Sequence, residues 1–238
     1  MEPQIFEALR QADLKIEGEF LWGSNSTFFL SASWNEKQFQ VVYKPVRGEQ
    51  PLWDFPPRTL AKREVAAYLV NEALGWELVP PTIFRQEAPF GPGMVQLYID
   101  HDPNYHYFTF SEQDRQRLQP VVLLDLLINN ADRKGSHILV DSESQIRCID
   151  HGVSFHVEDK LRTVIWDFAG QLIPQNYLDD VEHFHFELSK PSGVKEELEH
   201  YLTKAEIRAL IKRTEQILNT PYFPYPPQDR RSFPYPLI

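Results

Sequence analysis

The spacing of hydrophobic and polar positions changes part-way along this chain. In the first hundred residues, short segments with β-branched and aromatic side chains predict strands over 14–21, 27–32, 39–43, 79–84 and 94–99. Apolar residues one helical turn apart predict a short helix over 3–12 and a longer one over 60–74. Thr59 is placed to cap the longer helix and Gly75 to end it. This part is therefore expected to be an antiparallel sheet with one long helix.

Helical spacing predominates after residue 100. A helix is predicted over 111–118 with Ser111 as its cap, and Pro120 either kinks it or begins a new helix that runs to Ile128. After two short strands, the remainder is expected to be mostly helical. Thr203 and Glu206 match the capping box of a last helix, which is expected to end near residue 218.

These patterns divide the chain into a strand-rich part over 1–99, a mostly helical part over 100–220 and a tail over 221–238. Proline and aromatic residues crowd the tail, which favours an extended conformation. The tail either packs back across the helical part or serves as a partner-binding segment.

Composition narrows the class of protein. Aromatic residues make up 13% of the 238 positions, which is typical of a globular protein. The formal net charge of -10 argues against nucleic acid as a partner and against stable association with anionic membranes. The single cysteine, Cys148, excludes an internal disulfide and suits a reducing compartment. With no secretory signal and no stretch able to cross a bilayer, we expect a cytoplasmic protein.

Two aspartates suggest the chemistry. Asp132 follows a predicted apolar helix, and Asp150 lies eighteen residues later, after the predicted hairpin formed by strands over 138–140 and 146–149. Kinase-type sites place a catalytic base and a metal-binding carboxylate in this order beside a transferring phosphate. Lys44 at the end of the third strand is suited to hold ATP phosphates, and Glu64 on the following helix to hold the lysine. Together the four residues predict ATP- and metal-dependent phosphoryl transfer.

Three stretches carry a resemblance to known proteins: Val42 to Glu49, Asn130 to Gly135 and Lys160 to Phe168. They resemble the bacterial phosphatidylinositol 3- and 4-kinase-like proteins, a group of atypical kinases related to the HipA-type kinases. The resemblance covers roughly residues 14 to 170. It implies an α+β, bilobal protein-kinase-like fold, with a small N-lobe over 1–99 and a mostly helical C-lobe over 100–220. It also implies that Asp132 and Arg133 form the catalytic Asp-Arg pair, with ATP and Mg²⁺ or Mn²⁺ as cofactors.

The chain departs from this family at His137, where the pattern has a metal-binding asparagine. Imidazole suits manganese or zinc better than magnesium. His137 is therefore expected either to face the metal and shift the preference toward manganese, or to hydrogen-bond within its loop.

The expected nucleotide contacts lie in two further segments. Ser24, Asn25 and Ser26 form a turn with hydrogen-bonding groups, and they either contact the β- and γ-phosphates or form an ordinary hairpin turn. Adenine is expected to lie against the segment that contains Gln96 and Tyr98, through its backbone groups.

Residues near the acceptor side are harder to interpret. Lys160 and Arg162 follow the second aspartate, and they either hold an anionic acceptor or form ion pairs with nearby carboxylates. Trp53 and Phe55 are expected to be a packed aromatic cover. A metal-site interpretation of His183 and His185 is weaker than that of a polar helix or loop face.

The predicted function is transfer of phosphate from ATP to a hydroxyl of an unknown protein or small soluble molecule, with autophosphorylation as one form of it. A lipid acceptor is not favoured, because we find no basic amphipathic helix or lysine cluster to dock on anionic lipid. Two alternatives stay open: a nucleotide-binding pseudokinase without turnover, and transfer of AMP on the same fold.

Overall fold

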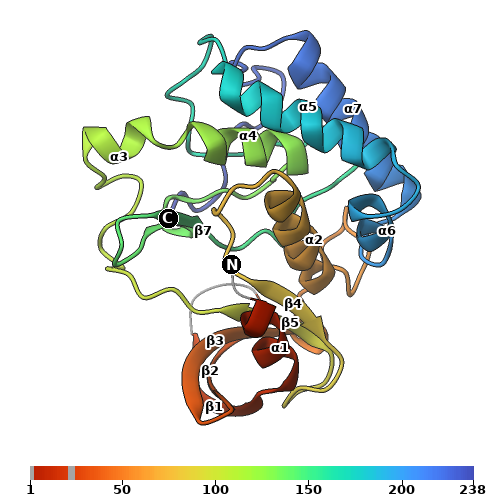
Figure 1. Cartoon of the computed structure of the whole chain (residues 1–238). Helices are drawn as coiled ribbons and strands as arrows, with labels where there is room; N and C mark the ends of the chain where they lie inside the picture. Colours follow the sequence, from red (N-terminus) through yellow and green to blue (C-terminus); the bar gives the residue numbers. More distant parts are fainter. Residues whose placement is uncertain (1–2, 21–24) are drawn as a thin grey trace.

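The computed structural model of this chain describes residues 3–20 and 25–238, with an antiparallel sheet at one end and a mainly helical part at the other (Figure 1). The sheet contains five strands in the order β1-β2-β3-β5-β4, and every neighbouring pair is antiparallel. Their bounds are Asp13–Phe20 for β1, Thr27–Trp34 for β2, Lys37–Pro45 for β3, Thr82–Arg85 for β4 and Gly93–Leu97 for β5. The predicted α+β class is confirmed.

Alternation along β3 decides which side chains face the helical part of the molecule. Val41 and Tyr43 are fully buried in a core on one face of the sheet, where Leu9 of helix α1 (Pro3–Gln11) also packs. Because successive side chains of a strand point to opposite faces, Lys44 projects from the other face. Helix α1 therefore covers the Val41 and Tyr43 face of the sheet, and the opposite face, which we call the lysine face, carries Lys44.

Helix α2 (Leu60–Ala73) lies on the lysine face of the sheet. Its residues Ala61 and Val65 pack with Met94 of β5 in a small apolar core. Met94 and Lys44 are direct partners across β5 and β3. The packing of α2 therefore brings its residue Glu64, between Ala61 and Val65, toward the lysine.

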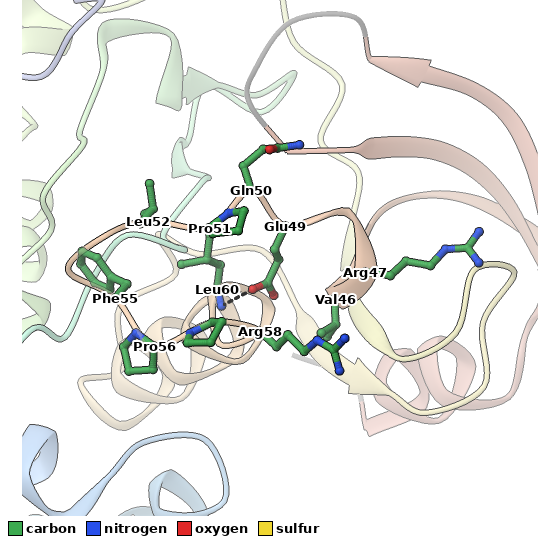
Figure 2. A pocket seen from close by; sticks show the side chains of 11 residues that line it. Val46, Arg47, Glu49, Gln50, Pro51, Leu52, Phe55, Pro56, Arg58 and Leu60 are labelled. Carbon is green, nitrogen blue, oxygen red and sulfur yellow. Dashed lines mark hydrogen bonds between the residues drawn. The ribbon is translucent and has the colours of Figure 1, made fainter.

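Thr59 is the N-cap residue of α2, as predicted, but its side chain makes no capping hydrogen bond, and a residue from a distant loop supplies these bonds. The Glu49 carboxylate accepts hydrogen bonds from the backbone N–H groups of Leu60 and Ala61, at 3.1 and 2.9 Å, whereas the Thr59 hydroxyl donates to the carbonyl of Pro56. Figure 2 shows Glu49 pointing at the helix from the loop that follows β3, beside a pocket of about 250 Å³. A carboxylate at this helix end is favoured by both hydrogen bonding and the helix dipole.

The helical part contains a two-stranded ribbon, five α-helices and a 3-10 helix over Gly135–His137 among the described residues. Their bounds are Ile138–Val140 for β6, Ile146–Cys148 for β7, Glu112–Gln116 for α3, Gln119–Ile128 for α4, Gln175–Ser189 for α5, Val194–Glu199 for α6 and Lys204–Asn219 for α7. Pro120 lies in the first turn of α4, so it begins a new helix rather than kinking one. The caps predicted at Ser111 and Thr203 are both confirmed.

The chain after the ribbon was expected to be mostly helical. This expectation is wrong for the segment 149–174, which has no helix or strand. Its backbone is held by loop and tail residues instead. The N–H of Arg162 donates to the carbonyl of Asn130, at 2.9 Å, and the N–H of Thr163 donates to Ser232, at 3.1 Å. Satisfied backbone groups of this kind allow an irregular segment to stay packed.

The tail follows the first of its two predicted alternatives and packs back across the helical part. Phe223 is 1% exposed and belongs to the main hydrophobic core. Further along, the carbonyl of Leu237 accepts a hydrogen bond from the N–H of Gly135, at 2.8 Å. The end of the tail therefore contacts the predicted catalytic loop at Gly135, which is three residues after Asp132 in the sequence.

None of the helices among residues 3–20 and 25–238 is long and apolar enough to cross a membrane.

Candidate active site

Three of the predicted residues meet where the sheet faces the helical part. The Nζ atom of Lys44 lies 2.6 Å from Oε1 of Glu64 and 2.8 Å from Oδ1 of Asp150. Glu64 is 1% exposed, and its other oxygen accepts the backbone N–H of His151, at 2.7 Å. The site therefore joins β3, α2 and the segment after the ribbon through one ammonium group.

The charges in this cluster stabilise one another. Burial works against the charge on Lys44, but Asp150 and Glu64 outweigh it and raise its pKa above the ordinary value. Burial also opposes the charge on Asp150, yet Lys44 and the neighbouring His137 hold the pKa of that carboxyl well below its usual range. Lys44 and Asp150 are therefore both charged at neutral pH.

The predicted catalytic loop is fixed by a buried ion pair. Arg133 is fully buried, and its guanidinium donates to the Asp125 carboxylate at 2.9 to 3.1 Å and to the carbonyl of Ile149 at 2.9 Å. This geometry favours a positioning role for Arg133 over contact with a substrate. The guanidinium links helix α4 to the residue before Asp150.

Sequence reasoning missed two residues of this arrangement. Asp125 is fully buried in α4, and Asn130 donates to it at 2.9 Å while accepting the backbone N–H of Asp132, also at 2.9 Å. The signal that could have revealed Asp125 is a single carboxylate inside an apolar helical run, because a buried charge needs a partner.

Asp132 lies partly buried, with 30% of its side chain exposed. Burial raises its pKa to about 6, although Lys134, whose Nζ lies 3.2 Å away, acts in the opposite direction. A carboxyl with a pKa in this range exchanges its proton near neutral pH, which suits a general base. Its predicted catalytic role stays a prediction.

His137 faces Asp150 and its own loop at the same time. Nε2 lies 3.3 Å from Oδ2 of Asp150, and Nδ1 lies 3.5 Å from the backbone nitrogen of Lys134. Burial lowers the pKa of His137 to about 4, so the ring is neutral at pH 7. Among the residues that the structure describes, no cluster of three histidine, cysteine, aspartate or glutamate side chains is arranged to hold a metal ion. Within this site, the side chains that could hold a metal are those of His137 and Asp150.

The turn before β2 borders the same site. Ser24 lies outside the described residues. Asn25 and Ser26 line a cavity of about 20 Å³ together with Lys44, Glu64 and Asp150. The side-chain oxygen of Asn25 accepts the N–H of Gln50 at 2.7 Å. Asn25 is thus engaged with the loop after β3, and its contact with phosphate stays a prediction.

The two residues predicted near adenine differ. Gln96 is 3% exposed, and its side chain donates to the Thr82 hydroxyl at 2.8 Å. Because β5 lies between β3 and β4, the backbone of Gln96 has a strand on each side and offers no free edge to a nucleotide. Gln96 therefore lies in the middle of the sheet, and the adenine contact expected for its segment stays a prediction. Tyr98 lies beyond the strand end and packs edge-on against Phe29, with ring centroids 5.0 Å apart.

On the acceptor side, Lys160 pairs with Asp54 at 2.9 Å, which agrees with the ion-pair interpretation. Arg162 acts on Asp132 only through its charge, which works to lower the pKa of that carboxyl. Phe55 is buried as expected, but Trp53 is 93% exposed, so its description as a packed cover is wrong. The Lys160 ammonium lies 5.0 Å from the centroid of the Trp53 ring.

The two histidines of α5 do not form a metal site with their neighbours. His185 shares a hydrogen bond of 2.7 Å with the Thr214 hydroxyl on α7, and His183 is exposed, 3.9 Å from Glu187. This agrees with the polar-face interpretation.

No model of a known protein family matches this sequence. Protein Rv2133c of Mycobacterium tuberculosis (strain ATCC 25618 / H37Rv) is 38% identical, over 96% of this chain and 93% of that protein. This chain belongs to the family of Protein Rv2133c. A more distant relative is Phosphatidylinositol 4-kinase gamma 4 of Oryza sativa subsp. japonica, which is 26% identical over 64% of this chain. The match spans about a third (34%) of the length of that kinase.

Solved structures of kinases share the fold. The Golgi casein kinase superposes with a TM-score of 0.57 at 15% identity, over 91% of this chain and 74% of its own, and its form with Mn/ADP bound gives 0.56. The Helicobacter pylori proinflammatory kinase CtkA gives 0.52 at 12% identity, over 90% and 94% of the two chains. The predicted protein-kinase-like fold is thereby confirmed. Membership of the narrower bacterial phosphatidylinositol 3- and 4-kinase-like group stays a prediction.

Proposed function

We propose that this protein is an ATP- and divalent-metal-dependent phosphotransferase that acts on a hydroxyl group. The observation that carries the proposal is the meeting of Lys44, Glu64 and Asp150, three residues from different elements, at one ammonium group. A lysine held by a helix glutamate and facing a metal-binding aspartate is the arrangement that positions ATP phosphates in kinases. The kinase-like fold supports the same conclusion.

Each residue then has a defined task. Lys44 binds phosphate oxygens. Glu64 keeps the lysine in place when phosphate oxygens replace Asp150 as the other partner of its ammonium group. Asp150 and the neutral His137 would hold a divalent cation, because a carboxylate oxygen and an imidazole nitrogen are suitable donors for such an ion. When bound, the cation would neutralise phosphate charge. The Mn/ADP-bound kinase neighbour supports use of a nucleotide and a metal. ATP-binding roles for Asn25, Ser26 and Tyr98 belong to the proposal as well.

The transfer step places Asp132 at the acceptor hydroxyl. The carboxylate accepts the hydroxyl proton as the hydroxyl oxygen bonds to the γ-phosphorus, and the bond from that phosphorus to the β–γ bridging oxygen breaks to release ADP. Arg133, locked to Asp125, keeps the loop in position during this step. The acceptor is a protein or a small soluble molecule. The proposed boundary between the N-lobe and the C-lobe lies between residues 99 and 100.

One observation favours the alternative of a nucleotide-binding protein without turnover. Lys44 contacts Asp150 directly, and the cavity that they line holds only about 20 Å³, roughly the space of one water molecule. Phosphates and a metal would have to separate this ion pair on entry. A protein in which the pair separates enough to admit ATP but not enough to align its phosphates would bind the nucleotide without transfer.

Incubation with ATP labelled at either the α or the γ phosphate distinguishes these functions. Transfer of the γ label to protein or to a hydroxyl acceptor supports the proposal. Transfer of the α label would identify an AMP transferase, and saturable ATP binding without transfer would identify a pseudokinase. Asp132→Ala is expected to abolish transfer while leaving ATP-induced thermal stabilisation in place.

A further inference from the structure

A groove of about 550 Å³ lies in the helical part, between helix α7, the segment 157–166 and the tail over 220–230. We call it the α7 groove. It shares no lining residue with the cavity around Lys44, so it is separate from the candidate active site. A volume of this size fits an organic molecule of drug-like dimensions.

The charge of the α7 groove is opposite to that of the whole chain. Its lining contains three cationic residues, Lys212, Arg213 and Arg230, and one carboxylate, that of Asp159. Arg230 and Asp159 are paired at 2.7 Å and neutralise each other. Lys212 makes no ion pair with any residue among 3–20 and 25–238. In a protein with a net charge of -10, this leaves two positive charges facing one groove.

Arg213 is incompletely satisfied. Its Nε donates to the carbonyl of Leu127 at 2.7 Å, and Nη1 lies 3.4 Å from the carbonyl of His156. Nη2 is buried and has no hydrogen-bond partner within the described part of the chain. Burial lowers the pKa of Arg213 to about 10, against the opposing effect of Asp159. A buried cationic donor without an acceptor is costly, so an acceptor is expected nearby.

A second hydrogen-bond donor on the wall of the groove also lacks an acceptor. The indole Nε1 of Trp166 is buried and has no acceptor among the described residues. Apolar contacts are plentiful around these donors, because Tyr225, Tyr222 and Val157 are 72, 53 and 50% exposed and all three line the groove. Aromatic and aliphatic surface beside unpaired donors is typical of a site for an amphipathic ligand.

We propose that the α7 groove is a binding site for a small organic anion, with a carboxylate, sulfonate or phosphate group on an apolar body. The anionic group lies toward Arg213 and Lys212, and the apolar body lies against the tyrosines of the tail. Asn129, which lines the groove, is the C-cap residue of α4 and lies three residues before Asp132 in the sequence. Binding does not depend on the proposed phosphotransfer.

The test uses two fluorescent probes of similar shape: the anion 8-anilinonaphthalene-1-sulfonate and its uncharged analogue N-phenyl-1-naphthylamine. Both are titrated into the full chain. We expect saturable binding of one sulfonate per chain, tighter than that of the neutral probe. Lys212→Gln is expected to weaken sulfonate binding about three- to tenfold, in line with the loss of one partly exposed charge, and to leave the neutral probe unchanged.

Two further variants make the outcome decisive. Ala209 lines the groove on α7, so Ala209→Trp is expected to fill it and remove both probes. Lys204→Gln, at the exposed start of the same helix and outside the groove, is the matched control and should leave both affinities unchanged. Equal sulfonate binding by wild type and Ala209→Trp, or an unchanged sulfonate affinity in Lys212→Gln, would overturn the proposal. Failure of the phosphotransfer assay leaves this result unaffected.

Discussion

Replacing Asp132 by asparagine should stop catalysis and stabilise the fold. Burial raises the pKa of Asp132 from its ordinary value of 3.8 to about 6. The folded protein therefore binds the proton more tightly than the unfolded chain, and the charged form lowers stability at every pH above this range. Each unit of pKa difference corresponds to about 1.4 kcal/mol. Two such units give about 3 kcal/mol at most.

Partial exposure and a neighbouring charge reduce this figure. Because 30% of the Asp132 side chain is exposed and Lys134 lies 3.2 Å away, we expect a net gain of about 1 to 2 kcal/mol for Asp132→Asn at pH 7.5. For a chain of this size, that corresponds to a rise in Tm of roughly 2 to 8 °C. At pH 4 the wild-type carboxyl is already mostly protonated in the folded state, so the gain should vanish.

The assay is denaturant unfolding at pH 4 and pH 7.5, together with γ-phosphate transfer. Transfer is expected to fall by about 100- to 10,000-fold, as for loss of a general base. Asp125→Asn is the control: it leaves the buried Arg133 without its charged partner and should lower the free energy of unfolding by about 3 to 5 kcal/mol. A lower stability of Asp132→Asn at pH 7.5, or a gain that is equal at both pH values, would refute the reasoning.

The remaining predictions concern other parts of the site and the tail. Lys44→Met should remove ATP-induced thermal stabilisation, measured by Tm with and without ATP and metal, and an unchanged shift would contradict the assigned role. His137→Asn should move the ratio of activities in Mn²⁺ and Mg²⁺ toward Mg²⁺, and an unchanged ratio would leave His137 as a loop residue. Wild-type transfer should rise as pH increases through about 6, where Asp132 loses its proton; a flat profile from pH 5 to 8 would count against Asp132 as base. Phe223→Ala should lower the free energy of unfolding by about 3 to 5 kcal/mol, because the ring is buried in the main core, and a cost below 1 kcal/mol would show that the tail is dispensable for stability.

Local sequence signals predicted most elements and several of the residues that meet. The helix over Leu60–Ala73, the capping box at Thr203 and the short ribbon over 138–148 all lie where the spacing indicated. Lys44, Glu64 and Asp150 were recognisable because their order relative to strands and helices is a local property of the chain. The protein-kinase-like fold followed from that order, and the kinase structures confirm it.

Contacts between distant segments account for what sequence reasoning got wrong. The Glu49 carboxylate, not the side chain of the N-cap residue Thr59, bonds the first N–H groups of α2. Trp53 is exposed although Phe55, two residues later, is buried. Both outcomes depend on which distant part of the protein packs against the residue, and the spacing of hydrophobic residues along the chain does not indicate this.

Residue order and spacing were enough to predict the order of the elements and the residue types available for phosphate and metal, because strand and helix periodicity and caps depend on near neighbours. Three features became visible only in the folded protein: Asp125 anchors Arg133 beneath the predicted catalytic loop, the tail bonds to Gly135, and cationic side chains line the α7 groove. These features join residues far apart in the chain. They arise because a folded protein must pair its buried charges and backbone groups wherever the packing brings partners together.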